Sequence, residues 1–230
     1  MCARRRRMHK QILGARHNQK IKDCSLTMQT KTFDPDRHVG TETSKSYRSL
    51  IESGFMQRYF SGDNTIEIGY AGGNGALPIT DNAIGIDQHY PGYDGIHLPF
   101  LDASQDTVYS SHCLEHLPNP AAALADWFRV LRVGGFLVVV VPHQQLYEKK
   151  MIMPSRYSGE HLKFYMPSTL LLEIERALPF GQWRLREMYD NDVGFDYSLS
   201  AFTHSTGCLE MVAVIERIPH YAYINEMLTS

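Results

Sequence analysis

One short stretch, residues 65–75, constrains the fold of this chain of 230 residues more than any other. Ile66 and Ile68 flank Glu67 at strand spacing, which predicts a short buried strand. The seven residues that follow contain four glycines, Gly69, Gly72, Gly73 and Gly75. Glycines lack the Cβ atoms that would keep a ligand away from the backbone. In open α/β sheets ligands bind at the carboxyl ends of strands, so the pattern predicts a nucleotide-like cofactor beside Gly69.

Composition predicts a single globular domain. Hydrophobic residues make up 43% of the chain, charged residues make up 21%, and the formal net charge is −2. A chain of this size can bury a full α/β core, and no stretch rich in proline, glycine and serine marks a linker to a second domain. The small net charge gives no global electrostatic reason to expect nucleic acid as a partner.

The amino-terminal segment differs from this average because its first 22 residues carry no acidic side chain. Its basic residues are Arg4, Arg5, Arg6, Arg7, Lys10, Arg16, Lys20 and Lys22. A charge run of one sign with few apolar residues predicts a disordered tail over residues 1–40, followed by the folded domain over residues 41–230. An organelle transit peptide and a phosphate-binding arm that contacts nucleic acid are the alternatives. No apolar segment follows the arginines, so we expect no secretory signal.

Cysteine usage and hydropathy indicate the compartment. Cys2, Cys24, Cys113 and Cys208 form no Cys-x-x-Cys pair, which favours a reducing compartment over a disulfide framework. No apolar run is long enough to span a membrane. We therefore expect a cytoplasmic protein without a membrane partner.

Hydrophobic spacing outlines a doubly wound α/β sheet. A helix is predicted over residues 41–60, one strand over 65–69 and a second over 83–86, which ends at Asp87. Pro78 limits any helix between these strands to about one turn, where a full crossover helix is usual. The other predicted elements are an edge strand at 96–98, a strand at 107–111, a helix at 120–133, a strand at 136–141, a helix at 167–178 and strands at 183–189 and 209–217.

Residues 143–166 break this regular pattern. Polar, aromatic and charged residues mix there without a helical or strand period. A long irregular insert after a central strand is typical of a loop that contacts substrate. We expect this insert to form part of the acceptor site.

Two cofactor classes fit a glycine loop after the first strand and an acidic residue after the second: a nicotinamide dinucleotide and S-adenosylmethionine. Glu67 favours the second, because dehydrogenases normally have an apolar residue at this position. The chain here resembles the class I S-adenosylmethionine-dependent methyltransferases, in particular the type 11-like small-molecule enzymes. The motifs that carry the resemblance are Glu67-Ile68-Gly69 with Gly72-Gly73, Asp87, Leu98-Pro99-Phe100, residues 104–108, residues 111–117 and residues 129–136.

The resemblance implies a single-domain, Rossmann-like, doubly wound sheet of seven strands, mostly parallel with an antiparallel last strand, and S-adenosyl-L-methionine as cofactor. It places Asp87 on the ribose hydroxyls and Asp94 on the adenine amino group. Ala71 departs from the family motif, which has its middle glycine there. The cofactor-binding residues that it implies are Glu67, Gly69, Tyr70, Ala71, Gly72, Gly73, Asp87, Gln88, Asp94, Ser111 and His112.

Methyl transfer from a sulfonium is an in-line displacement, so the protein mainly aligns the acceptor and excludes water. A hydroxyl acceptor also needs a base, and histidine can take a proton near neutral pH. The candidate catalytic residues are His143, His116 and His161, with His143 the first to test. The candidate substrate-binding residues are Tyr47, Tyr147, Arg156 and Glu160, although each of them could equally be a core or surface residue.

Residues 112–116 also match the His-x-x-Glu-His pattern of an inverted zinc peptidase motif. That chemistry needs both histidines on one face of a sustained helix. Pro118 and Pro120 close the segment at once, so we expect no metal there.

The acceptor is constrained by a missing motif. The Asp/Asn-Pro-Pro-aromatic motif of enzymes that methylate nucleic-acid amino groups is absent after the strand at 107–111. We therefore predict a methyltransferase that acts on a small-molecule acceptor, at a hydroxyl group. An NAD(P)-dependent oxidoreductase on a Rossmann fold and a non-catalytic S-adenosylmethionine-binding interaction protein are the alternatives. The sequence leaves the acceptor's identity and the oligomeric state open.

Overall fold

The computed structural model describes residues 31–70, 72–221 and 223–229. Most of the predicted tail and Ala71 therefore lie outside the described residues. The helices are α1 (Thr41–Glu52), α2 (Phe55–Tyr59), α3 (Pro120–Val130), α4 (Pro167–Ala177) and α5 (Tyr223–Thr229), with short turns η1 (Gly73–Gly75), η2 (Leu114–His116) and η3 (Gln144–Glu148). The strands are β1 (Thr65–Ile68), β2 (Ala83–Ile86), β3 (Gln105–Ser111), β4 (Leu131–Pro142), β5 (Trp183–Asn191) and β6 (Glu210–Arg217).

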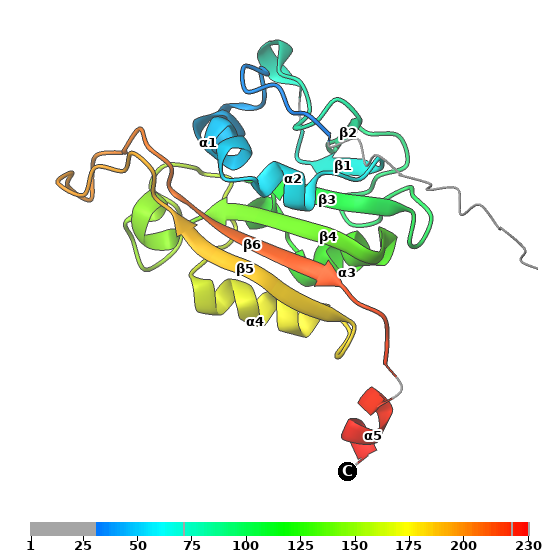
Figure 1. The fold of residues 1–230 in the computed structure, drawn as a ribbon. Coiled ribbons are helices and arrows are strands. Elements are labelled where there is room, and N and C mark those ends of the chain that lie inside the picture. Colours follow the sequence, from blue (N-terminus) through cyan, green and yellow to red (C-terminus); the bar gives the residue numbers. More distant parts are fainter. Residues whose placement is uncertain (1–30, 71, 222, 230) are drawn as a thin grey trace, which may run out of the picture.

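The described strands form one sheet in the order β2-β1-β3-β4-β6-β5 (Figure 1). β2, β1, β3 and β4 run parallel, and β6 is antiparallel to both β4 and β5. The predicted α/β class and the reversed carboxyl-terminal hairpin are confirmed. The described residues supply six strands, not seven, and the predicted edge strand at 96–98 is wrong. Backbone N–H groups there are taken by side chains, because Ile96 donates to Asp94 and Leu98 donates to Asp126.

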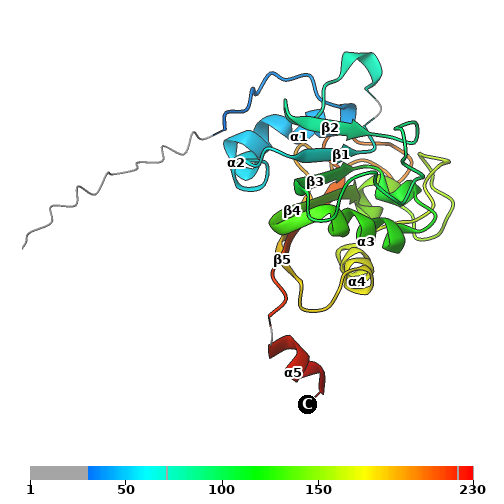
Figure 2. The same ribbon diagram turned by 90° about the vertical axis from the view of Figure 1, so that its right-hand side faces the viewer.

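Helices cover both faces of the sheet, as Figures 1 and 2 show. On one face, Tyr47 and Phe55 from α1 and α2 pack on Val138 and Val214 of β4 and β6. On the other face, residues of α3 and α4, including the fully buried Trp127, pack on the same strands. This arrangement leaves the carboxyl edge of β1 and β3 open for the loops that follow them.

Several element boundaries differ from the predictions, two of them by more than a few residues' shift in length. The helix predicted over residues 41–60 divides at Gly54, whose φ of 74° lies in the left-handed region that ends helices. The helix predicted over residues 120–133 ends at Val130, and β4 starts at once with Leu131. The short connection expected between the first two strands is confirmed, because its described residues hold the single turn η1 and no longer helix.

Residues 31–40, which the sequence assigned to the tail, lie along the folded domain. The backbone N–H of Leu77 donates to the His38 carbonyl at 2.7 Å, and the Lys31 ammonium donates to the Gly62 carbonyl at 2.9 Å. Val39 is buried in the core cluster beneath α1. Residues 31–40 therefore pack on the folded domain beside α1. The predicted boundary of the tail at residue 40 stays a prediction.

The irregular segment 143–166 packs against the β5–β6 loop at one end of the sheet, where Figure 1 shows the loop projecting. The Lys149 ammonium donates to the carbonyls of Ser200 and Thr203, at 3.2 and 2.9 Å. The Tyr157 hydroxyl donates to the Ala201 carbonyl at 2.9 Å. Two segments distant in sequence are thus joined beside the carboxyl end of β4.

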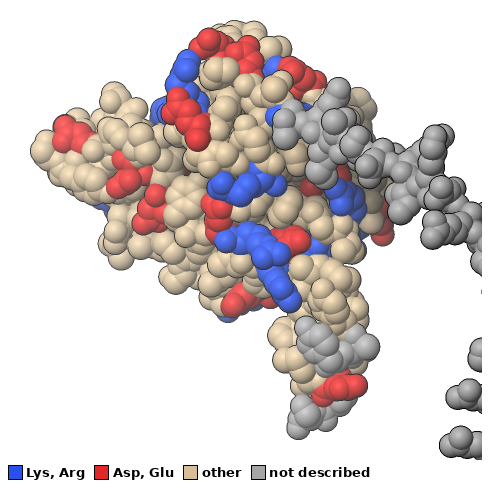
Figure 3. All heavy atoms as spheres, viewed as in Figure 1, with Lys and Arg blue, Asp and Glu red and all other residues tan. Residues whose placement is uncertain are grey.

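The surface seen in Figure 3 mixes both signs of charge. Arg58 pairs with Glu187 at 3.1 Å, and Arg186 pairs with Glu216 along the β5–β6 hairpin. None of the helices in the described ranges is long and apolar enough to cross a membrane.

Candidate active site

The loop after β1 turns sharply because Gly69 adopts a φ of 85°. Its N–H donates to the Ile86 carbonyl at 2.8 Å, which ties the end of β1 to the end of β2. A Cβ atom on Gly69 would stand 2.8 Å from the Cβ of Cys113. Both the backbone conformation and the close approach therefore require glycine at this position.

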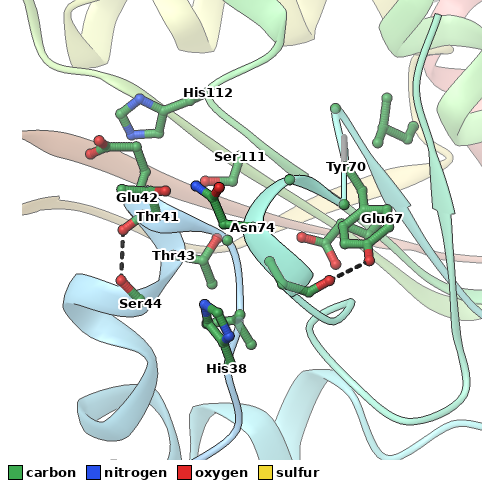
Figure 4. Close-up of a pocket in the computed structure, with 17 residues that line it drawn as sticks. His38, Thr41, Glu42, Thr43, Ser44, Glu67, Tyr70, Asn74, Ser111 and His112 are labelled. Carbon is green, nitrogen blue, oxygen red and sulfur yellow. Dashed lines mark hydrogen bonds between the residues drawn. The ribbon is translucent and has the colours of Figure 1, made fainter.

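A cavity of about 510 Å³ opens beside this loop. Its walls are the glycine loop, the end of β3, the start of α1 and the segment that precedes α1 (Figure 4). The lining residues are His38, Val39, Gly40, Thr41, Glu42, Thr43, Ser44, Glu67, Ile68, Gly69, Tyr70, Gly72, Gly73, Asn74, Ala76, Ser111 and His112. The volume and the polar lining suit a small, polar ligand.

Glu67 anchors the floor of this cavity. Its carboxylate accepts a hydrogen bond from the backbone N–H of Ile79 at 2.6 Å, which holds the far end of the glycine loop. Burial raises the pKa of Glu67 to about 7, and the bond from Ile79 opposes this shift. Burial therefore favours the neutral form of this carboxyl group, next to the ligand space, more than in an exposed glutamate.

Tyr70 braces the loop from within. Its hydroxyl donates to the Ala76 carbonyl at 2.6 Å, and its ring covers Gly85 of β2, where a Cβ would overlap the ring carbons. The glycine in the middle of β2 therefore makes room for Tyr70. The side chains of Tyr70 and Glu67 thus hold the glycine loop, although the surface that faces the ligand space is largely backbone.

Of the cofactor-binding residues implied by the resemblance, the cavity gathers Glu67, Gly69, Tyr70, Gly72, Gly73, Ser111 and His112. Asp87, Gln88 and Asp94 are not among its lining residues. Asp87 nevertheless directly follows Ile86, which accepts the bond from Gly69, so it borders the site.

The Asp87 carboxylate accepts the N–H of His89 at 2.8 Å. Asp94 has a different role, because its carboxylate closes an exposed turn. It accepts the backbone N–H of His97 at 2.7 Å and pairs with the ring of that residue at 2.8 Å. These bonds hold the pKa of Asp94 well below its usual range.

Sequence reasoning missed the wall formed by the start of α1. Glu42 and Thr43 lie in its first turn, and His38 precedes it (Figure 4). The cap residue Gly40 offers no side-chain acceptor to the first N–H groups of α1. The helix start at residues 41–44 was visible in the sequence, but its missing side-chain cap and its position against the glycine loop were not.

The three predicted catalytic histidines occupy two places. His143 is buried outside the cavity lining, and its Nδ1 accepts the backbone N–H of Gln145 at 3.1 Å. Burial lowers the pKa of His143, and Asp190, 3.6 Å from Nε2, opposes this shift.

His116 and His161 lie together, with ring centroids 4.9 Å apart. Both approach Glu115, and His112 connects this group to the cavity. The Glu210 carboxylate lies 2.9 Å from His112 Nε2. Although burial opposes it, the interactions with Glu210 and Glu115 raise the pKa of His112.

The predicted substrate-binding residues are dispersed. Tyr47 is buried in the core and donates its hydroxyl hydrogen to the Ile79 carbonyl at 3.1 Å. Tyr147 packs against His161 and His204, at 5.1 and 4.9 Å between ring centroids. Arg156 lies over the ring of Phe202, and Glu160 is exposed. None of the four lines the cavity beside the glycine loop.

Comparison with known proteins finds similarity to methyltransferases over part of the chain. The family model described as "Methyltransferase domain" matches residues 71–139. A "Probable S-adenosylmethionine-dependent methyltransferase" of Mycolicibacterium smegmatis is 35% identical over 102 residues, which are 36% of this chain and 40% of that protein. An uncharacterised chloroplastic methyltransferase of Arabidopsis thaliana is 33% identical over 79 residues, which are 30% of this chain and 21% of that protein. The chain thus spans well under two thirds of these relatives.

Solved structures are similar to the chain at low sequence identity. The [4+2]-cyclase SpnF superposes with a TM-score of 0.52 at 12% identity, over 81% of this chain and 85% of that protein. A methyltransferase of Mesorhizobium loti that depends on S-adenosylmethionine gives 0.44 at 12% identity, over 74% and 87%. The sheet order and the glycine loop agree with the matched domain, and the chain is similar to S-adenosylmethionine-dependent methyltransferases.

Proposed function

We propose that this protein transfers the methyl group of S-adenosylmethionine to a hydroxyl group of a small molecule. The observation that carries the proposal is the cavity between the glycine loop and the start of α1, floored by Glu67 and closed by Ser111 and His112. Its position at the carboxyl end of β1 is where open α/β sheets bind ligands.

The amino-acid part of the donor carries one positive and one negative group. The first N–H groups of α1 lack a side-chain cap and suit a carboxylate. Glu42 in the same turn and the buried Glu67 suit an ammonium or a sulfonium. Backbone at Gly72 and Gly73 permits close approach of the ligand chain. Asp87 at the end of β2 is proposed to accept hydrogen bonds from the ribose hydroxyls.

The acceptor is proposed to enter beside His112, near the segment 143–166 and the β5–β6 loop. The transferred methyl leaves the sulfur as a new carbon–oxygen bond forms, and S-adenosylhomocysteine is released. A hydroxyl acceptor loses its proton in this step, so a base must stand close by. The histidines and carboxylates around His112 supply groups of that kind.

Calorimetric titration of the full chain tests the donor assignment. We expect S-adenosylhomocysteine to bind with one-to-one stoichiometry, and NAD and NADP to give no saturable heat. Binding of a nicotinamide dinucleotide in place of S-adenosylhomocysteine would support the oxidoreductase alternative and refute the proposal.

An acceptor screen separates an enzyme from a non-catalytic binding protein. Small molecules that carry hydroxyl or amine groups are incubated with the donor, and S-adenosylhomocysteine release is followed. We expect turnover with hydroxyl compounds. Turnover with amines alone would contradict the proposed hydroxyl target.

The base is tested by conservative variants. His143→Gln is expected to lower turnover if His143 removes the proton, with little change in donor affinity. The alternative is a structural role, which its buried position and its hydrogen bond from Gln145 would also support. The two are distinguished by the pH profile of turnover, which only loss of the base would alter in shape.

A further inference from the structure

Behind His112 lies a buried carboxylate that lacks hydrogen-bond partners. The Glu115 side chain is 1% exposed. Within the described part of the chain, neither Oε1 nor Oε2 has a hydrogen-bond partner. A carboxylate in such a place requires compensation, because burial of an unpaired charge is strongly unfavourable. The side chains that face Glu115 show what that compensation can be.

Three imidazoles approach the same oxygen of Glu115. The Oε1 atom lies 3.6 Å from His116 Nε2, 3.9 Å from His161 Nε2 and 3.9 Å from His112 Nδ1. These separations exceed the 2.7–3.2 Å of an N–H···O hydrogen bond. Two ligand atoms at about 2.0–2.2 Å from one zinc ion stand roughly 3.3–3.9 Å apart for bond angles between tetrahedral and about 130°. The observed spacing therefore matches atoms that share a metal ion.

In His116 and His161 the ring nitrogen that faces away from Glu115 already donates a hydrogen. His116 Nδ1 lies 3.1 Å from the Glu160 carbonyl, which can only accept. His161 Nδ1 lies 2.5 Å from a carboxylate oxygen of Glu148. With that nitrogen protonated, the neutral ring presents its other nitrogen, a lone pair, to Glu115. Two lone pairs facing a carboxylate repel it unless a cation lies between them.

This arrangement is the one that metal-binding histidines adopt. Metal-ligating histidines almost always donate their other ring N–H to a carboxylate or a backbone carbonyl. Glu148 is buried and is itself held by the Ser155 hydroxyl at 2.5 Å, so it fixes the ring of His161. The ligand atoms of Glu115, His116 and His161 all lie within 4.8 Å of one another.

We propose that Glu115, His116 and His161 bind a divalent transition-metal ion of the zinc type. Two imidazoles and one carboxylate are a zinc ligand set that leaves a fourth position open. His112 Nδ1 lies beside this set, and His112 also lines the donor cavity, so the metal would lie next to the proposed methyl-donor site. Nitrogen ligands disfavour magnesium, which prefers oxygen.

The site differs from the inverted zinc peptidase pattern. In that pattern both histidines of residues 112–116 would lie on one helix, but η2 is a single turn from Leu114 to His116. The second histidine ligand is instead His161, which lies 45 residues beyond His116 in the insert. The three ligands come together through tertiary packing and could not be recognised from the spacing of the motif.

The test uses the full chain after removal of metals by a chelator. Titration with zinc chloride, followed by calorimetry, is expected to show one saturable equivalent, and magnesium chloride at the same concentrations is expected to show none. Cobalt(II) is expected to give the visible absorption of a four-coordinate site. Absence of a saturable equivalent of zinc would overturn the proposal. No step of the test depends on methyl transfer, so its outcome is separate from that of the proposed function.

Variants locate the metal. His116→Gln and His161→Gln are each expected to weaken zinc binding more than ~100-fold, and Glu148→Gln is expected to weaken it ~10–100-fold. His204→Gln is the matched control, because His204 packs on Tyr147 beside the site but lies outside the ligand set. His116 is only half-buried, so its variant serves if His161→Gln does not fold. Unchanged zinc affinity in both histidine variants would place the metal elsewhere and refute the site.

Discussion

The donor cavity and the Glu115–His116–His161 cluster lie on either side of His112, yet they are built in opposite ways. The cavity is lined by the glycine loop, whose glycines expose backbone, together with residues 38–44 and the end of β3, and it is open to ligand. The cluster consists of metal-ligating side chains from two distant segments and is largely buried. Backbone sites depend on local conformation, whereas side-chain clusters depend on packing. Substitutions should therefore affect the two regions differently.

Gly69→Val should have the largest effect, and it should act on the fold. The φ of 85° and the Cys113 Cβ only 2.8 Å from a new Cβ combine backbone strain with overlap. We expect the free energy of unfolding to fall by about 2–6 kcal/mol, the sum of these two costs. Urea denaturation measures this change. An unaltered unfolding midpoint would show that the loop conformation is not fixed by β1.

Gly73→Val should instead change donor affinity and leave stability intact. Gly73 has an ordinary φ, lines the cavity and has open space where its Cβ would stand. Filling that space should weaken S-adenosylhomocysteine binding by about 1–3 kcal/mol. Gly159→Val is the matched control, since Gly159 also has open space but lies outside the cavity.

The two regions should also be separable by their ligands. Gly73→Val should leave zinc affinity unchanged, because no residue of the cluster lies on the glycine loop. A parallel loss of zinc and donor binding would contradict the separation and would indicate that both belong to one site.

Asp87→Ala should weaken donor binding by about 1–2 kcal/mol, because ribose hydroxyls would lose their acceptor. Asp94→Ala is the comparison variant, and we expect no measurable change, since its carboxylate serves an exposed turn. Calorimetric affinities of both variants decide between the two positions. Equal losses of donor affinity in both variants would indicate that Asp94 also contacts the donor. Unchanged donor affinity in both variants would refute the assignment of Asp87 to the ribose.

Glu67→Gln should change the pH dependence of the free energy of unfolding. The pKa of Glu67 is about 7 in the folded protein and near 4.5 when exposed, so between these values the folded state holds the extra proton. The free energy of unfolding of the wild-type chain should therefore fall as pH rises from about 4.5 to 7, by up to ~1.4 kcal/mol per unit. The variant should lose this slope, and denaturation at pH 5 and pH 8 measures it. An identical slope in both proteins would assign the titration to another group.

Much of the fold could be predicted from sequence because the relevant signals are local. Alternating apolar residues specified β1, the unbroken apolar run specified β4, and Pro78 limited the connection between β1 and β2 to the turn η1. The predicted edge strand at 96–98 failed because Asp94 and Asp126 take its backbone donors. Asp126 lies on α3, so this competition was not visible in the neighbouring residues.

The sequence by itself determined the glycine loop and the resemblance to methyltransferases, because backbone freedom at Gly69 and Gly72 is a property of those residues alone. Only the tertiary structure brought the start of α1 against the loop, buried His143 away from the cavity and carried His161 to Glu115. The physical reason is that burial and electrostatic contact depend on which segments pack together. Spacing along the chain does not encode that packing when the ligands lie 45 residues apart.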